Sequence, residues 1–161
     1  MVKFKQVILL ICLTGCLAAC KKNVPVDDYD PTPQFKADTA AISTFVKTNN
    51  IPATKDASGI FYQIIAPGSG NVSYLTSTVI TADYEGRLLN GTIFDSTKGT
   101  PISFKLGNVI LGWQFGIQKI QKGGKIRLII PSYFGYGTQS PSSSIPPNSV
   151  LDFTITLTDV Q

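Results

Sequence analysis

Histidine is absent from this chain of 161 residues. It is the commonest general base near neutral pH and the commonest metal ligand of proteins. A Ser-His-Asp or Cys-His catalytic arrangement is therefore excluded, unless a partner supplies the missing group. The chain also lacks a GxSxG motif and a paired-carboxylate motif, so nothing in the sequence supports a hydrolase.

Cysteine is confined to the beginning of the chain, at Cys12, Cys16 and Cys20. This distribution excludes a disulfide scaffold or a zinc site inside a folded domain that follows. We therefore expect no metal and no cofactor in that domain. We interpret Cys12 and Cys16 as small apolar residues of a leader.

A strong charge of either sign is also missing. The formal net charge is +4. Two of the basic residues, Lys3 and Lys5, lie near the start, which leaves 12 basic and 10 acidic side chains in residues 21–161. Nucleic-acid binding requires lysine and arginine gathered on one face, so we expect no nucleic-acid partner.

Residues 1–19 have the features of a secretory signal peptide. Lys3 and Lys5 form a positive start, and an apolar run over residues 7–13 is followed by small residues. A helix that spans a bilayer needs about 20 apolar residues, so this run fits a cleaved signal better than an anchor helix.

The sequence Leu-Ala-Ala-Cys at residues 17–20 resembles a bacterial lipobox, in which the cysteine carries the lipid after cleavage. This resemblance implies lipidation of Cys20 and a membrane-anchored lipoprotein of the cell envelope. Residues 13–16 also satisfy the pattern, but modification of Cys16 would leave a second free thiol just after the anchor. The alternative is an ordinary secreted protein with incidental cysteines.

Residues 20–35 are predicted to be a lipidated cysteine and a flexible tether, since this stretch is rich in proline and aspartate and has little to bury. A helix and its connection are expected over residues 36–58. Apolar residues recur at helical spacing over residues 38–49, and we interpret Asp38 as the N-cap. This helix is expected to pack on the domain, with dimerisation as the alternative.

From Gly59 onward the apolar pattern changes to a period of two. Residues 60–65, 78–88, 125–130 and 150–157 predict strands with one buried and one solvated face, which is typical of an antiparallel sheet. Residues 112–122 keep helical spacing. The pattern predicts an α+β domain over residues 59–161, with one helix across one face of the sheet.

Aromatic residues occur in several of these segments. Taken singly, each is better explained as core. Asp95 directly follows Phe94, however, and Tyr136 lies between two glycines. Aromatic walls with a few placed polar groups are the usual form of a small-ligand site.

In this order and spacing the motifs resemble the FK506-binding-protein (FKBP) type of peptidyl-prolyl cis-trans isomerase, over about residues 59–161. The resemblance implies a strongly twisted antiparallel sheet wrapped around a short helix. The motifs that carry it are residues 83–86 (Asp-Tyr-Glu-Gly), 91–96 (Gly-Thr-Ile-Phe-Asp-Ser), 109–113 (Val-Ile-Leu-Gly-Trp), 136–137 (Tyr-Gly), 145–147 (Ile-Pro-Pro) and 150–153 (Val-Leu-Asp-Phe).

The same resemblance implies a site without metal. Trp113 would form the floor under a proline ring, and Ile110 would offer its backbone N–H to a substrate carbonyl. Asp95 and the Tyr136 hydroxyl would be the catalytic polar contacts, with the role of Asp95 left open between orienting neighbours and meeting the rotating carbonyl. Ile145 would close the rim. The walls would be Tyr84, Phe94, Val109, Ile110 and Phe153, with Phe104 as wall or core.

The resemblance implies an isomerase that acts on X–Pro bonds of exported or envelope proteins. FK506-type macrolides are the inhibitors that it suggests. The chain departs from many relatives at Ile102 and in the serine-rich loop over residues 138–144, and both departures touch the rim. Two alternatives are a non-catalytic chaperone or proline-segment binding module with the same fold, and a structural envelope lipoprotein.

Overall fold

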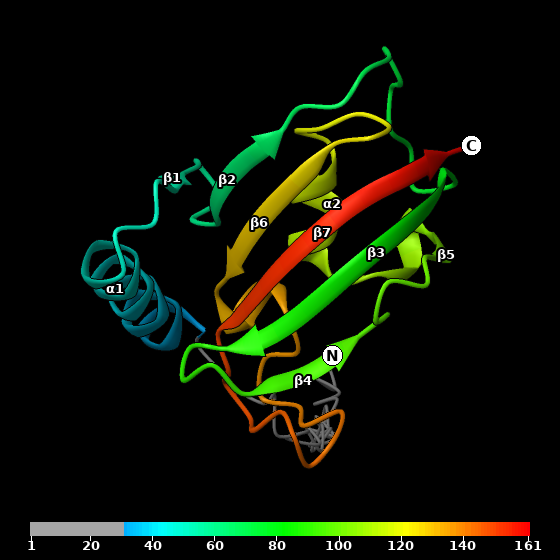
Figure 1. Ribbon diagram of the computed structural model, residues 1–161. Helices are drawn as coiled ribbons and strands as arrows, with labels where there is room; N and C mark the ends of the chain where they lie inside the picture. Colours follow the sequence, from blue (N-terminus) through cyan, green and yellow to red (C-terminus); the bar gives the residue numbers. More distant parts are fainter. Residues whose placement is uncertain (1–30) are drawn as a thin grey trace, which may run out of the picture.

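A computed structural model describes residues 31–161 (Figure 1). The helices are α1 (Thr32–Thr48) and α2 (Leu111–Ile117), with 3-10 turns η1 (Leu106–Asn108) and η2 (Ser132–Phe134). The strands are β1 (Thr54–Lys55), β2 (Phe61–Ala66), β3 (Val79–Leu88), β4 (Ile93–Ser96), β5 (Ile102–Lys105), β6 (Lys125–Ile130) and β7 (Leu151–Val160).

Part of the sequence-based prediction concerns the beginning of the chain. The signal peptide over residues 1–19, the lipid site Cys20 and the tether as far as residue 30 lie outside the described residues. From residue 31 onward, no helix combines the length and the apolar character that a membrane span requires.

The strands form one antiparallel sheet in the order β1-β2-β6-β7-β3-β4, and β5 also pairs with β3. The long strand β7 lies between β6 and β3 and pairs with both (Figure 1). The four strands predicted from period-two alternation correspond to β2, β3, β6 and β7. The predicted α+β arrangement, an antiparallel sheet with a short helix across one face, is thus confirmed.

The main core lies on the inner face of the sheet, where α2 packs (Figure 1). Inward-facing residues of β3, β6 and β7 alternate with outward-facing polar ones, as the pattern predicted. Fully buried members of this core include Ile80, Ile117, Ile126, Leu128, Ile155 and Leu157.

Glycines let α2 approach the sheet closely. A Cβ added to Gly112 would lie 2.5 Å from Ile130 Cγ2, and Ile130 is fully buried on β6. Gly116, one turn later, has Leu128 of the same strand in the equivalent place. Trp113 lies between these glycines on α2, so the close approach of the helix also determines how deeply the Trp113 side chain lies in the core.

We expect Gly112→Ala to lower the free energy of unfolding by about 1–3 kcal/mol, because overpacking of a well-filled core costs this much. The measurement is urea unfolding of both proteins. Gly123→Ala is the comparison without overpacking, since no heavy atom lies within 4 Å of a Cβ there. Its cost comes from backbone strain alone, because Gly123 has a φ of 80°. Equal midpoints for Gly112→Ala and the parent would contradict the packing argument.

The N-terminal helix packs on the domain, as expected, but its predicted start is wrong. Helix α1 begins at Thr32 with Pro31 at the N-cap position, so its first turn occupies the end of the predicted tether. Pro33 lies in this first turn, where proline is favourable because its φ is already helical. Asp38 is therefore no N-cap: it lies inside the helix, is 4% exposed and bonds to Ser132.

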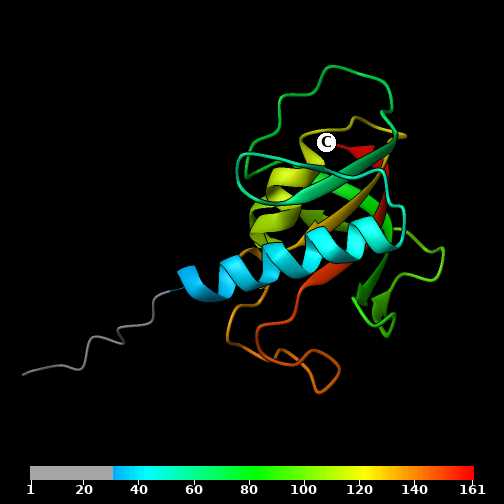
Figure 2. The same ribbon diagram turned by 90° about the vertical axis from the view of Figure 1, so that its left-hand side faces the viewer.

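Helix α1 lies against the sheet (Figure 2), and a second, smaller apolar cluster is buried beneath it. Ile42 packs there with Phe61 of β2 and Ile129 of β6, and Phe45 lies at its edge. Phe61 and Ile129 are paired across the two strands and point to the opposite face from the main core. The sheet thus has apolar cover on both faces, not on one.

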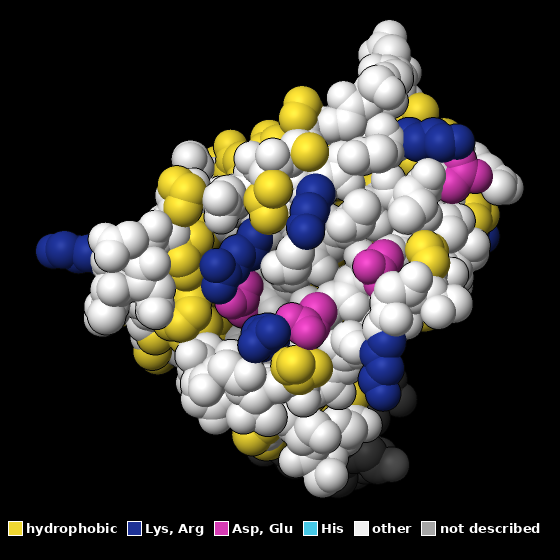
Figure 3. All heavy atoms as spheres, viewed as in Figure 1, with side chains coloured by type: hydrophobic (Ala, Val, Ile, Leu, Met, Phe, Trp, Pro, Cys, Tyr) yellow, Lys and Arg dark blue, Asp and Glu magenta, His cyan; other side chains and the backbone are white. Residues whose placement is uncertain are grey.

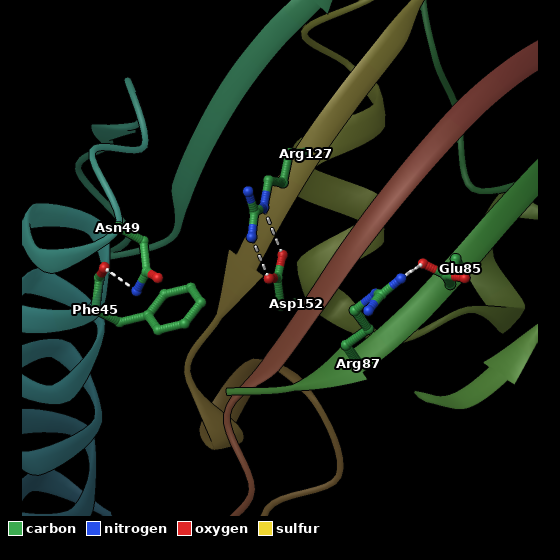
Figure 4. A network of polar contacts seen from close by, with 6 residues as sticks. All are labelled: Phe45, Asn49, Glu85, Arg87, Arg127 and Asp152. Carbon is green, nitrogen blue, oxygen red and sulfur yellow. Dashed lines mark hydrogen bonds and ion pairs between the residues drawn. The ribbon is translucent and has the colours of Figure 1, made fainter. Parts of the chain in front are cut away.

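The remaining outer face carries Lys and Arg interspersed with Asp and Glu (Figure 3). Asp152 lies on the face of β7 that the alternation over residues 150–157 predicted to be solvated, and that prediction is wrong at this position. Asp152 is 5% exposed and accepts hydrogen bonds from Arg127 Nε at 2.9 Å and Nη2 at 2.6 Å (Figure 4). Phe45 of α1 points toward this pair, and all three side chains line the same hollow on the outer face.

Candidate active site

A cavity of about 270 Å³ opens on the inner side of the sheet, next to α2. Strands β3, β4, β5 and β7, the segment before α2 and the loop after η2 all contribute to it. Its lining residues are Tyr84, Asp95, Phe104, Asn108, Val109, Ile110, Trp113, Tyr136 and Phe153.

Trp113 of α2 forms the base of the aromatic cluster and is 4% exposed. Its ring meets Tyr84, Phe153 and Phe104 edge-on, with centroid distances of 5.1, 5.4 and 5.7 Å. Edge-to-face contacts are favourable because the positive ring edge meets the negative ring face. Four rings from α2, β3, β5 and β7 therefore hold one another in place, with Trp113 at the base of the cavity.

Asp95 is exposed and joins the aromatic cluster through Tyr84. The Tyr84 hydroxyl donates to Asp95 Oδ2 at 2.5 Å. Burial, followed by this hydrogen bond, raises the pKa of Tyr84 far above its ordinary value. Burial, followed by the charge of Asp95, also raises the pKa of the Tyr136 phenol. Both phenols therefore keep their protons and can act as hydrogen-bond donors at neutral pH.

The pairing of β3 with β4 places Asp95 at the cavity. Gly86 pairs with Asp95, and a register shift follows between Gly86 and Arg87. A Cβ on Gly86 would lie 2.6 Å from both Phe94 Cζ and Phe153 Cε1. Glycine at this position therefore leaves the space that the two rings occupy, and their centroids are 5.4 Å apart.

The backbone of Ile110 lies at the start of α2 and lines the cavity. Its carbonyl accepts from the N–H groups of Trp113 and Gln114, and the Gln114 side chain holds the Val109 carbonyl at 2.8 Å. Within the described residues, the Ile110 N–H itself donates to no protein acceptor. A donor at the cavity wall is thus fixed in place and available.

The structure brings together most of the predicted site. Phe94 is not among the lining residues and packs edge-on against Phe153, which is one of them. Ile145 is 5% exposed and belongs to the main core, so it does not line the cavity as a rim residue. Asn108 lines the cavity and was not predicted, since an exposed asparagine in a short turn carries no pattern of its own.

No group of three or more Cys, Asp or Glu side chains in residues 31–161 is arranged to hold a metal ion. The cavity instead offers aromatic walls, two protonated phenols, one carboxylate and a backbone N–H. Such a set can bind an apolar ring and hydrogen-bond the peptide groups on either side of it.

Comparison with known proteins agrees with this geometry. The family model of FKBP-type peptidyl-prolyl cis-trans isomerase matches residues 73–158. A probable FKBP-type isomerase of Haemophilus influenzae is 42% identical over 118 residues, which are 72% of this chain and 48% of that protein. The isomerase FkpA of Escherichia coli is 42% identical over 107 residues, 65% of this chain and 39% of that one. The chain thus spans less than half the length of these two curated relatives.

Solved structures show the same fold. The crystal structure of FkpA from Escherichia coli matches with a TM-score of 0.65 and 33% identity, covering 81% of this chain and 64% of that one. A peptidyl-prolyl cis-trans isomerase from Pseudomonas syringae matches with a TM-score of 0.66 and 32% identity, covering 83% and 98%. The motifs, the fold and these matches together place the chain in the FKBP-type peptidyl-prolyl cis-trans isomerase family.

Proposed function

We propose that this protein accelerates cis–trans rotation about X–Pro bonds in exported or envelope polypeptides. The observation that carries the proposal is the ring-lined cavity over Trp113, with the Tyr84–Asp95 pair and the Tyr136 hydroxyl at its side. A proline ring fits an apolar floor. The peptide groups before and after it need the polar partners.

The chemistry requires no nucleophile and no proton transfer. An X–Pro bond rotates over a barrier of about 18–20 kcal/mol because twisting the C–N bond removes amide resonance. The planar amide is the more polar state and is better solvated by water. A cavity walled by aromatic rings therefore favours the twisted state relative to the planar state.

Each residue then has a defined part. Trp113, Phe153 and Phe104 hold the proline ring, and the Ile110 N–H and the Tyr136 hydroxyl donate to substrate carbonyls. Asp95 orients Tyr84 and places a negative charge beside the cavity. Each 1.4 kcal/mol of binding that appears only in the twisted state gives about a tenfold acceleration.

Trp113 is the only tryptophan of the chain, so it reports binding directly. A proline tetrapeptide should change its fluorescence, and the same peptide should show faster exchange between its cis and trans NMR signals when the full-length chain is added. A fluorescence change without faster exchange would overturn the proposal and favour the non-catalytic binding module. FK506-type macrolides are proposed to compete for the same cavity.

We expect kcat/KM to stay constant from about pH 6 to about pH 9.5, because the chain lacks histidine and both cavity phenols remain protonated. Above about pH 10 stability should fall, since the unfolded chain releases its phenol protons first. A pH–rate profile checks the first expectation, and unfolding curves recorded at the same pH values check the second. A decline in kcat/KM centred near about pH 8 would contradict this assignment.

We also propose that a lipid on Cys20 anchors the protein to a membrane of the cell envelope, on the extracytoplasmic side. The support is the lipobox-like sequence before Cys20. Several acyl chains would hold a small domain on a bilayer essentially permanently, at about 0.8 kcal/mol per buried methylene. Cys20→Ser should move the protein from the membrane to the soluble fraction, whereas Cys16→Ser should not. Membrane retention of Cys20→Ser would contradict the anchor.

A further inference from the structure

Helix α1 lies outside the region that the family model matches, residues 73–158, yet it makes a buried polar contact with the domain. Asp38 Oδ2 accepts from the Ser132 backbone N–H at 2.8 Å and from the Ser132 hydroxyl at 2.6 Å. Asp38 is 4% exposed and Ser132 is 1% exposed. The contact joins positions 94 residues apart in the sequence.

A carboxylate buried to this extent is costly unless its lone pairs are satisfied. The other oxygen of Asp38 accepts from the Gln34 side chain at 2.7 Å. Within residues 31–161 no lysine or arginine forms an ion pair with Asp38. Neutral donors alone therefore hold the group, and two of the three belong to Ser132.

Ser132 is also the anchor of the loop that carries Tyr136. Its carbonyl accepts from the Gly135 N–H at 2.9 Å and from the Gly137 N–H at 2.8 Å. These two glycines flank Tyr136 directly. Because Gly137 has a φ of 57° and its carbonyl accepts from the Asn148 N–H at 2.7 Å, the turn is fixed on its far side as well.

We propose that Asp38 is a positioning residue for Tyr136: through Ser132 it fixes the turn that points the Tyr136 hydroxyl into the cavity. The inference rests on the proposed isomerase function and extends the site to a helix beyond the family-matched region. All three groups that Ser132 offers, its N–H, hydroxyl and carbonyl, are engaged in this chain of contacts.

Helix α1 and η2 are also joined by aromatic packing. Phe35, one turn before Asp38, meets Tyr133 and Phe134 edge-on at 6.3 and 6.0 Å. Both rings belong to η2, which directly precedes the turn around Tyr136. Helix α1 therefore contacts each of the three residues of η2, and the Asp38 carboxylate is the part that bonds to the backbone.

The test uses the full-length chain in one detergent, with Asp38→Ala, Asp38→Asn and a packing control, Ile42→Ala. Ile42 lies one turn after Asp38, is fully buried, and packs in the cluster of Phe61, Ile129 and Val150 without a polar group that could bond to Ser132. We expect Asp38→Ala to lower kcat/KM about tenfold, mainly through kcat, because a small displacement of a positioned group is costly in rate. Asp38→Asn keeps an acceptor and should recover most of this loss.

A double-variant comparison separates positioning from stability. In a Tyr136→Phe background, adding Asp38→Ala should change kcat/KM less than twofold, since the hydroxyl it positions is already gone. Ile42→Ala should lower the unfolding midpoint but leave kcat/KM of the folded protein within twofold. A tenfold loss that persists in the Tyr136→Phe background, or an equal loss in Ile42→Ala, would overturn the proposal.

An NMR readout keeps the inference distinct from the proposed activity. The amide signals of Gly135 and Gly137 should shift in Asp38→Ala and stay in place in Ile42→Ala, whatever the catalytic rate. If the parent chain has no isomerase activity but these shifts occur, the proposed function fails and the linkage stands. If the signals are unmoved in Asp38→Ala, the linkage fails.

Discussion

Replacing Asp95 with alanine is expected to lower kcat/KM by about 10- to 100-fold. The Tyr84 hydroxyl donates to this carboxylate at 2.5 Å, and each tenfold in rate corresponds to about 1.4 kcal/mol of binding that appears only in the twisted state. Without the carboxylate, Tyr84 loses its orientation and the cavity loses its negative charge. The protease-free peptide assay measures the effect.

Asp95 is exposed on β4, so its removal should leave the unfolding midpoint nearly unchanged. Tyr84→Phe provides the matched comparison: it removes the same hydrogen bond but keeps the ring and the carboxylate. We expect its loss in kcat/KM to be smaller than that of Asp95→Ala. If Asp95→Ala retains the full parental rate, the carboxylate has no part in the reaction.

Replacing Arg127 with methionine is expected to lower the free energy of unfolding by about 2–3 kcal/mol. Removing one partner of a buried ion pair leaves the other charge uncompensated, at a cost of about 3–5 kcal/mol. Here Asp152 is 5% exposed while the Arg127 side chain is 27% exposed, which places the cost below that range. Chemical unfolding of both proteins measures it.

Arg87 offers a control on the same face of the sheet. It pairs with Glu85 at 2.5 Å, but the two side chains are 44% and 38% exposed (Figure 4). Exposed pairs of this kind contribute about 0–1 kcal/mol, so Arg87→Met should be nearly neutral. Equal losses for Arg127→Met and Arg87→Met would show that burial of Asp152 is not the cause.

The long strands were predictable because each alternates over enough residues to define a face. Strand β4 has only four residues, Ile93–Ser96, and β1 has two. A period of two is not readable over such lengths, and the pairing of β4 with β3 decides its conformation. Likewise, the polar face of β7 was expected to be solvated, because Arg127, which bonds to Asp152, is 25 residues away in the sequence.

The floor and the polar groups of the site follow from motifs that the sequence displays, such as Phe94 and Asp95 in one strand and Tyr136 between two glycines. The rim does not. Ile145 was placed there by its position after Tyr136, but its loop folds back and buries it in the core. The hydrogen bond between Asp38 and Ser132 was also not predicted, since hydrogen bonds between residues so far apart leave no local pattern in the sequence.

The central claim is that this cavity accelerates X–Pro rotation. It is tested most directly by a protease-free cis–trans assay of the full-length chain beside Asp95→Ala and Tyr136→Phe, over a series of proline tetrapeptides. The predicted result is clear acceleration by the parent and a lower rate in both variants, with all three proteins folded. No acceleration by the folded parent, or full rates in both variants, would contradict it.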